Sequence, residues 1–224
     1  MAPLLSSVES AAITIEFVRA RPKIEMMKVV VGGHSRNIGK TSVVAGIINA
    51  MPEMKWTAMK ITQYGHGICS RNGRACHCST EEHRYAIVEE TDPNGRGDSC
   101  RFLSAGAKRS LWVRTKQGML SQAMEEIHQI LHQSENTIIE SNSILEFFKP
   151  DLYLVVLDYS NADFKPSARK YLERADACIL IHPGPENPKW EIVRESDFVH
   201  KPSFKITPPV YVDQDIVEFV RRSL

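Results

Sequence analysis

The chain of 224 residues is long enough for one α/β domain with a single buried core. Its 28 basic and 27 acidic side chains leave a formal net charge of +1, which gives no electrostatic reason to expect nucleic acid or an anionic membrane as a partner. No apolar run approaches the roughly 20 residues that cross a bilayer, and the N-terminal segment lacks the pattern of a secretory signal, so we expect a cytoplasmic protein.

The first part of the chain alternates predicted strands with a predicted helix. Residues 28–34 (KVVVGGH) contain an uninterrupted β-branched run, which is typical of a buried parallel strand. Residues 40–50 carry apolar side chains at helical spacing, and Pro52 follows as a stop signal. A second strand is expected at residues 56–62.

Periodicity is lost between residues 63 and 98, a segment rich in Gly, Cys, His and charged residues that we interpret as a loop insert. Order returns with a predicted helix at 98–107, a strand at 110–115 and a helix at 119–135. The apolar face expected for the last of these helices consists of Leu120, Met124, Ile127, Ile130 and Leu131.

The second half continues the same alternation. Strands are predicted at 136–141, 151–158 and 177–182, helices at 144–150, 166–174 and 213–224, and a largely irregular proline-rich segment at 183–209. Strands that alternate with helices favour a mostly parallel sheet with helices on both faces. The sequence therefore predicts a three-layer α/β fold in a single domain that spans residues 1–224.

The junction between the first strand and the first helix is a candidate phosphate-binding loop, GHSRNIGKTS. Gly33 and Gly39 enclose five residues, one more than in the standard loop, and Lys40 and Thr41 follow. Backbone N–H groups at such a junction point inward, and the helix N-terminus adds partial positive charge. We expect Lys40 to reach the β- and γ-phosphates and the Thr41 hydroxyl to bind Mg²⁺. The expected nucleotide contacts are Gly33, His34, Ser35, Arg36, Asn37, Ile38, Gly39, Lys40, Thr41 and Ser42.

These motifs resemble one branch of the phosphate-loop proteins. The spacing Gly-x5-Gly-Lys-Thr is similar to that of dethiobiotin synthetase, whereas MKITQYGHG (59–67) and DPNGRGDSCRFLSAGA (92–107) resemble segments of the MobB family (molybdopterin-guanine dinucleotide biosynthesis protein B). The similarity covers about residues 28–160, and taken together the motifs resemble MobB more than dethiobiotin synthetase. It implies a P-loop NTPase fold that binds ATP or GTP with Mg²⁺.

The resemblance also implies roles for three charged residues beyond the loop. Lys60 would face the phosphates or the substrate, so that Lys40 and Lys60 are the expected catalytic residues. Glu140 resembles the strand-end glutamate that helps to hold Mg²⁺, and its place at the carboxyl end of a parallel strand suits a ligand site. Asp98 fits as a further magnesium partner with Thr41 and Glu140, and Asp92 is its competitor, since Mg²⁺ needs only one or two carboxylates.

A second candidate metal site lies in the insert. Thiolates and imidazoles at high density suit tetrahedral Zn²⁺, and the expected ligands are Cys69, Cys76, Cys78 and His83, with Cys100 an equal candidate for the fourth position. The alternative is a loop with reduced cysteines, because an odd total of five cysteines does not suggest a disulfide framework.

Four functions are compatible with these patterns. The leading hypothesis is a MobB-like ATPase or GTPase that assists a phosphorylated cofactor or a partner enzyme, as in molybdenum-cofactor biosynthesis. The alternatives are a metallochaperone-type GTPase that uses the Cys/His insert, a dethiobiotin-synthetase-like ligase, and a non-catalytic nucleotide-binding adaptor. The choice between ATP and GTP stays open because no Asn-Lys-x-Asp signature for guanine is present, and a homodimer is a further possibility.

Overall fold

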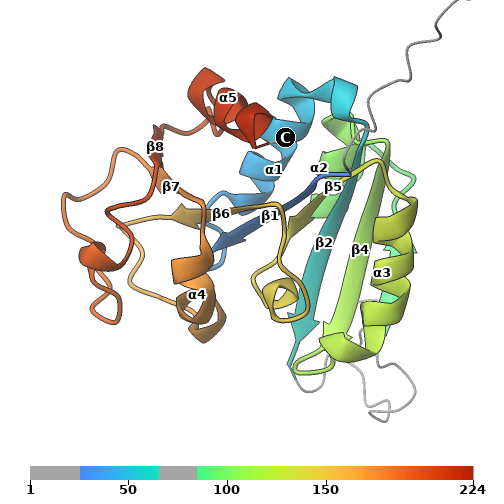
Figure 1. Cartoon of the computed structure of the whole chain (residues 1–224), viewed down its shortest axis with the longest axis horizontal. Coiled ribbons are helices and arrows are strands. Elements are labelled where there is room, and N and C mark those ends of the chain that lie inside the picture. The colour runs from blue at the N-terminus through green and yellow to red at the C-terminus, as the bar shows by residue number, and fades with distance from the viewer. Residues whose placement is uncertain (1–25, 66–84, 224) are drawn as a thin grey trace, which may run out of the picture.

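An eight-stranded sheet forms the middle layer of the structure, a computed structural model that describes residues 26–65 and 85–223 (Figure 1). The strand order is β3-β4-β2-β5-β1-β6-β7-β8. Within the described ranges, only β3 runs antiparallel to its neighbour. The strands are β1 Lys28–Gly33, β2 Trp56–Tyr64, β3 Tyr85–Glu89, β4 Arg109–Lys116, β5 Asn136–Glu140, β6 Leu152–Leu157, β7 Ala177–Ile181 and β8 Ser203–Ile206.

Helices cover both faces of this sheet. The α-helices are α1 Lys40–Ala50, α2 Asp98–Ser104, α3 Met124–Gln133, α4 Pro166–Tyr171 and α5 Gln214–Arg222. Short 3-10 helices are η1 Pro52–Met54, η2 Leu120–Ala123, η3 Ser143–Glu146, η4 Leu172–Arg174 and η5 Glu195–Asp197. Helices α1, α2 and α5 lie on one face, and α3 and α4 lie on the other (Figure 1).

The alternation of side chains along β1 explains the two cores. Val29 and Val31 belong to the cluster beneath α1, α2 and α5, whereas Val30 belongs to the cluster beneath α3 and α4. All three valines are fully buried, because successive residues of a strand point to opposite faces and both faces are covered here. The three-layer α/β fold predicted from the sequence is confirmed.

The helix predicted at 119–135 differs in its first turn. Residues Leu120–Ala123 form the 3-10 helix η2, and the α-helix begins only at Met124. The predicted apolar face is nevertheless buried at all five of its positions: Leu120, Met124, Ile127, Ile130 and Leu131. Likewise, the helix predicted at 144–150 is reduced to the short 3-10 helix η3.

Two strands lie in segments that the sequence predicted as irregular. Strand β3 falls within the 63–98 insert and pairs with β4, and β8 falls within the proline-rich 183–209 segment and pairs with β7. Each is a short strand at an edge of the sheet. An edge strand pairs with one neighbour, which binds about half of its backbone N–H and C=O groups. Their pairing depends on residues distant in sequence, which local composition does not reveal.

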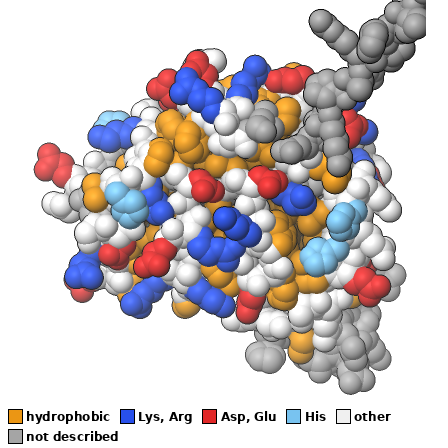
Figure 2. All heavy atoms as spheres, viewed as in Figure 1, with side chains coloured by type: hydrophobic (Ala, Val, Ile, Leu, Met, Phe, Trp, Pro, Cys, Tyr) orange, Lys and Arg blue, Asp and Glu red, His pale blue; other side chains and the backbone are white. Residues whose placement is uncertain are grey.

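The described surface carries no extended patch of one charge sign on the face seen in Figure 2, where acidic and basic side chains are interspersed. None of the helices in residues 26–65 and 85–223 combines the length and the apolar character needed to cross a bilayer.

Candidate functional site

The register of three strands places two charged residues side by side at one end of the sheet. Glu140, the last residue of β5, lies opposite Val31 of β1 on one side and opposite Lys60 of β2 on the other. Paired residues of neighbouring strands point to the same face of a sheet. Since Val31 faces α1 and α2, Glu140 and Lys60 also point towards these two helices.

The first turns of α1 and α2 complete a network around Glu140. The Thr41 hydroxyl of α1 donates a hydrogen bond to Glu140 Oε2 at 2.8 Å. Lys60 Nζ contacts Glu140 Oε1 and lies 2.9 Å from Asp98 Oδ2 of α2. The Glu140 side chain is only 3% exposed, so its negative charge is held by the adjacent ammonium group and hydroxyl rather than by water.

The loop before α1 contains two residues in the left-handed backbone conformation. Asn37 and Gly39 both have positive φ angles, 56° and 91°. A Cβ at Gly39 would also come within 2.5 Å of the Tyr211 ring, which packs directly against this glycine. Glycine is therefore required at position 39 both for its left-handed conformation and for the close approach of an aromatic side chain.

The backbone N–H groups of this loop are available to a ligand. In the described part of the chain, none of the N–H groups of residues 35–39 donates a hydrogen bond, although Ser35 and Ile38 are buried. Phosphate oxygens bound at the N-terminus of α1 would satisfy these N–H groups, so the loop fits the group that its sequence predicts.

Lys40 lies within this loop and faces its interior. Its ammonium group donates a hydrogen bond to the Ser35 carbonyl oxygen, which closes the loop on itself. Burial lowers the pKa of Lys40 to about 8; Glu140 opposes this shift, and the nearby ammonium groups of Lys165 and Lys60 add to it. A half-buried cation among other cations is an environment that favours an anionic ligand.

His34 fixes the loop to the segment after β6. Its Nδ1 lies 2.7 Å from the carbonyl oxygen of Asp163, and its Nε2 accepts a hydrogen bond from the Asp158 N–H at 3.0 Å. This pair of contacts requires a neutral ring with its proton on Nδ1. Burial lowers the pKa of His34 below its ordinary value. The ring also packs on Trp190 and Phe164, so His34 has a structural role beside its expected place in the nucleotide loop.

Asn142 ties the end of β1 to the end of β5. Its Oδ1 accepts a hydrogen bond from the Gly33 N–H at 2.9 Å, and its Nδ2 donates to the Gly33 carbonyl oxygen at 2.8 Å. The side chain replaces the backbone ladder where β1 ends, and it thereby sets the direction in which the loop leaves the sheet.

Three contacts of the site were missed by sequence reasoning. They are the double hydrogen bond of Asn142, the Tyr211 ring on Gly39, and the hydrogen bond from Arg101 to the Ser42 hydroxyl at 2.9 Å. Asn142 stands close to Glu140 in sequence, and Arg101 lies within the 92–107 segment that resembles MobB; these are the signals that could have found them. Tyr211 carries no such signal, because it reaches the loop from the far end of the chain.

The structure separates the two aspartates that competed as magnesium partners. Asp98 touches Lys60 in the network. Asp92 is exposed and instead accepts a hydrogen bond from the Asn94 N–H at 2.9 Å, in a turn of its own. Thr41, Glu140 and Asp98 therefore form one oxygen cluster of the kind that suits Mg²⁺ with phosphate oxygens and water. Their role as metal ligands stays a prediction.

The expected zinc ligands cannot be placed. Cys69, Cys76, Cys78 and His83 lie outside the described residues, so the zinc site also stays a prediction. Cys100 is described: its buried thiol donates to Glu90 Oε2 at 3.0 Å. Within residues 26–65 and 85–223, no group of three or more His, Cys, Asp or Glu side chains is arranged to hold a metal ion.

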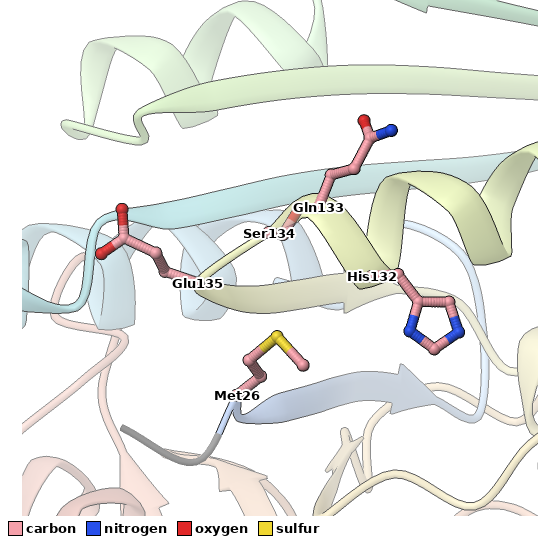
Figure 3. A pocket seen from close by; sticks show the side chains of 5 residues that line it. All are labelled: Met26, His132, Gln133, Ser134 and Glu135. Atoms are coloured by element: carbon pink, nitrogen blue, oxygen red, sulfur yellow. The ribbon is translucent and has the colours of Figure 1, made fainter. Parts of the chain in front are cut away.

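A small pocket lies at the opposite end of the sheet from the phosphate loop. It is lined by Met26, just before β1, and by His132, Gln133, Ser134 and Glu135, where α3 leads into β5 (Figure 3). Its lining includes no residue of the Thr41, Glu140, Lys60 and Asp98 network. Open α/β sheets bind their ligands at the carboxyl ends of the strands, and this pocket lies at the amino ends.

No protein-family model and no curated protein matches the sequence. Among solved structures, LpxK from Aquifex aeolicus in complex with ATP is 20% identical with a TM-score of 0.43, and the match covers 81% of this chain and 54% of LpxK. HypB from Helicobacter pylori in complex with nickel is 14% identical with a TM-score of 0.45, covering 88% of this chain and 84% of HypB.

A MobB structure is also among the similar ones. Bacillus subtilis MobB is 17% identical with a TM-score of 0.39, and the match covers 88% of this chain and 97% of MobB. The chain spans about half the length of LpxK. At such identities and scores these similarities concern the fold at most. The candidate site is inferred from contacts within this chain. The expected likeness to MobB is confirmed to this extent, and the relation to dethiobiotin synthetase stays a prediction.

Proposed function

We propose that this protein binds a nucleoside triphosphate with Mg²⁺ at the loop between β1 and α1 and cleaves or transfers its terminal phosphate. The observation that carries the proposal is the contact of Thr41, in the first turn of α1, with the buried strand-end carboxylate of Glu140. This pairing brings a metal-binding hydroxyl and a carboxylate together beside a loop in which, among the described residues, the N–H groups of residues 35–39 donate no hydrogen bond.

Each residue has a distinct task in this scheme. The loop N–H groups and Lys40 bind and orient the β- and γ-phosphates. Thr41, Glu140 and Asp98 would hold the metal, which supplies positive charge to the phosphate oxygens. Catalysis of phosphoryl transfer consists mostly of such positioning and charge stabilisation, so the chain needs no covalent intermediate.

The acceptor of the phosphate is proposed from the sequence resemblance alone. A MobB-like protein would act beside a phosphorylated cofactor or a partner enzyme, and slow hydrolysis by water is the activity expected in their absence. The segment after β6 offers Asp158, Asn161 and Lys165 without the guanine signature, so both ATP and GTP belong in the first binding experiments.

The test is a comparison of Lys40→Met with Lys55→Met. Methionine keeps most of the aliphatic stem of lysine and removes the charge. Lys55 is a suitable control because its ammonium group lies in an exposed ion pair with Glu135, away from the phosphate loop. Thermal unfolding is measured with and without Mg²⁺ and ATP or GTP.

Nucleotide at 100 times its dissociation constant should stabilise the wild type and Lys55→Met by about 2.7 kcal/mol. Lys40→Met should lose nearly all of this stabilisation, because the cation that faces the phosphates is gone. The proposal is wrong if neither nucleotide shifts the wild type, or if Lys40→Met responds as strongly as the control does.

A further inference from the structure

Lys60 occupies the position at which the oxygens of the site converge. Its Nζ lies 2.9 Å from Asp98 Oδ2 and 3.5 Å from Thr41 Oγ1, and it contacts Glu140 Oε1. These are the same three side chains that would hold Mg²⁺. The ammonium group is thus surrounded by carboxylate and hydroxyl oxygens, which are the ligands that Mg²⁺ prefers.

Burial explains why a cation belongs at this position. The side chains of Glu140 and Lys60 are 3% and 18% exposed. A buried carboxylate without a cation is strongly destabilising, and within the described residues Lys60 provides the only ammonium group in contact with Glu140. The protein without ligand therefore depends on Lys60 to balance the buried charge of Glu140.

An ammonium group and a magnesium ion cannot share these oxygens. Mg²⁺ requires its ligands at about 2.1 Å, so an ion bound to Glu140 and Asp98 would lie almost where Lys60 Nζ now lies. Two cations at such a separation repel each other strongly beside the buried Glu140, whose side chain is 3% exposed, even though Asp98 on the other side is 42% exposed. Lys60 must leave when the ion arrives, and its flexible four-carbon stem allows this movement.

We propose that Glu140 and Asp98 hold one cation at a time, the ammonium group of Lys60 before nucleotide binds and Mg²⁺ afterwards. The displaced ammonium group then needs new anionic partners, and the terminal phosphate oxygens of the nucleotide provide them. Mg²⁺ consequently enters with the nucleotide rather than alone. This exchange rests on the proposed function for the identity of the phosphate ligand, whereas the competition between Lys60 and the metal does not.

The competition is tested with Mn²⁺ alone, whose binding is followed by electron paramagnetic resonance. Lys60→Met removes the charge and keeps the stem, Lys60→Gln removes the charge and keeps a hydrogen-bond donor, and Lys60→Arg keeps the charge. We expect the two neutral variants to bind Mn²⁺ at least about tenfold more tightly than the wild type, because the competing cation is gone. Lys60→Arg should bind it as weakly as the wild type does.

Two further measurements locate the ion. The double variant Lys60→Met with Glu140→Gln should lose the gain in affinity if the ion binds at Glu140. Mn²⁺ should also raise the urea midpoint of Lys60→Met and leave that of the wild type unchanged. A neutral variant that folds only with Mn²⁺ present supports the proposal, and one that stays unfolded with Mn²⁺ contradicts it.

Equal Mn²⁺ affinities of the wild type and both neutral variants would overturn the proposal. That failure is distinct from failure of the proposed function, which is decided by nucleotide binding to the wild type. If the neutral variants gain Mn²⁺ affinity and the wild type binds no nucleotide, the cation exchange stands and the nucleotide assignment falls. If the wild type binds nucleotide and the neutral variants gain no Mn²⁺ affinity, the nucleotide assignment stands and the cation exchange falls.

Discussion

Strand β5 has a glutamate at each end, and the two have opposite surroundings. Glu135, just before the strand, accepts hydrogen bonds from Lys108 at 2.8 Å and Lys55 at 3.1 Å, and its side chain is 39% exposed. Glu140, the last residue of the strand, is bound by Lys60 and Thr41 and is 3% exposed. Both carboxylates have two partners, so the number of contacts does not distinguish them.

The difference lies in what covers each end of the sheet. At the carboxyl ends of the strands, the first turns of α1 and α2 close over Glu140 and exclude water. At the amino ends, Glu135 borders the open pocket of Figure 3. Exposed ion pairs are screened by water and contribute little to stability, whereas a buried pair becomes indispensable once it is formed. A contact between a carboxylate and lysine is therefore a surface ion pair of little energetic consequence at one end of β5 and part of a candidate site at the other.

Two other residue types repeat this comparison. Asn136 at the start of β5 binds the Met27 N–H and the Met54 carbonyl oxygen, as Asn142 beyond its end binds Gly33. His132 is exposed in the pocket lining, whereas His34 is fully buried beside the phosphate loop. The chain thus offers matched controls at the amino ends for the glutamate, asparagine and histidine variants at the carboxyl ends.

The largest expected effect separates the two glutamates. Glu140→Gln should lower the free energy of unfolding by about 3 kcal/mol, because Lys60 loses its buried partner and keeps only Asp98, which is 42% exposed. Glu135→Gln should leave the urea midpoint unchanged within error, since its partners are solvated lysines. Equal losses in the two variants would show that burial does not set the value of these contacts, and the contrast between the two ends of β5 would disappear.

The two asparagines should differ in function rather than in stability. Asn136→Ala and Asn142→Ala each remove two hydrogen bonds to the backbone, at a cost of about 2 kcal/mol in urea unfolding. Only Asn142→Ala should weaken nucleotide binding, by roughly tenfold, because a loop freed at Gly33 no longer presents its N–H groups in one orientation. If both variants bind nucleotide like the wild type, Asn142 has no part in shaping the loop.

The sequence predicted those parts of the site that depend on local order. Lys40 and Thr41 follow from the succession of a strand, a loop and a helix. The magnesium role of Glu140 is implied by the family resemblance and agrees with the rule that ligands bind at the carboxyl ends of parallel strands. Lys60 and Asp98 came from the resemblance to MobB. Their contact with each other requires the β2–β5 register and the position of α2, which no short motif contains.

The parts that the sequence did not predict are contacts between distant segments. Asn142 meets Gly33 across 109 positions of the chain, and Tyr211 approaches Gly39 from the segment between β8 and α5. Strands β3 and β8 similarly exist because a partner strand is present at the edge of the sheet. Such contacts are decided by tertiary packing, which overrides local propensity.

The smallest expected effect separates the two histidines and depends on pH. His34 must be neutral to donate from Nδ1 to Asp163 and accept at Nε2 from Asp158. Burial lowers its pKa, the nearby carboxylates of Asp158 and Asp163 partly oppose this shift, and Lys40 adds to it. In the unfolded chain the ring binds a proton near pH 6.5, whereas in the folded protein it does so only at lower pH.

The unfolded state therefore binds more protons as the pH falls below 6.5, and the free energy of unfolding must decrease. The contribution of His34 is fully present above that pH and declines by at most about 1.4 kcal/mol for each pH unit below it. Urea unfolding between about pH 8 and 5.5 should give a shallower pH dependence for His34→Gln than for the wild type. His132→Gln, which changes an exposed side chain at the open end of the sheet, is the control variant. Parallel curves for all three proteins would mean that the ring of His34 binds a proton at the same pH in the folded and the unfolded state, so that its contacts do not favour the neutral ring. The loop would then be held to the segment after β6 by the hydrogen bonds from Ser35 Oγ to Asp163 and from the Lys165 N–H to the His34 carbonyl oxygen.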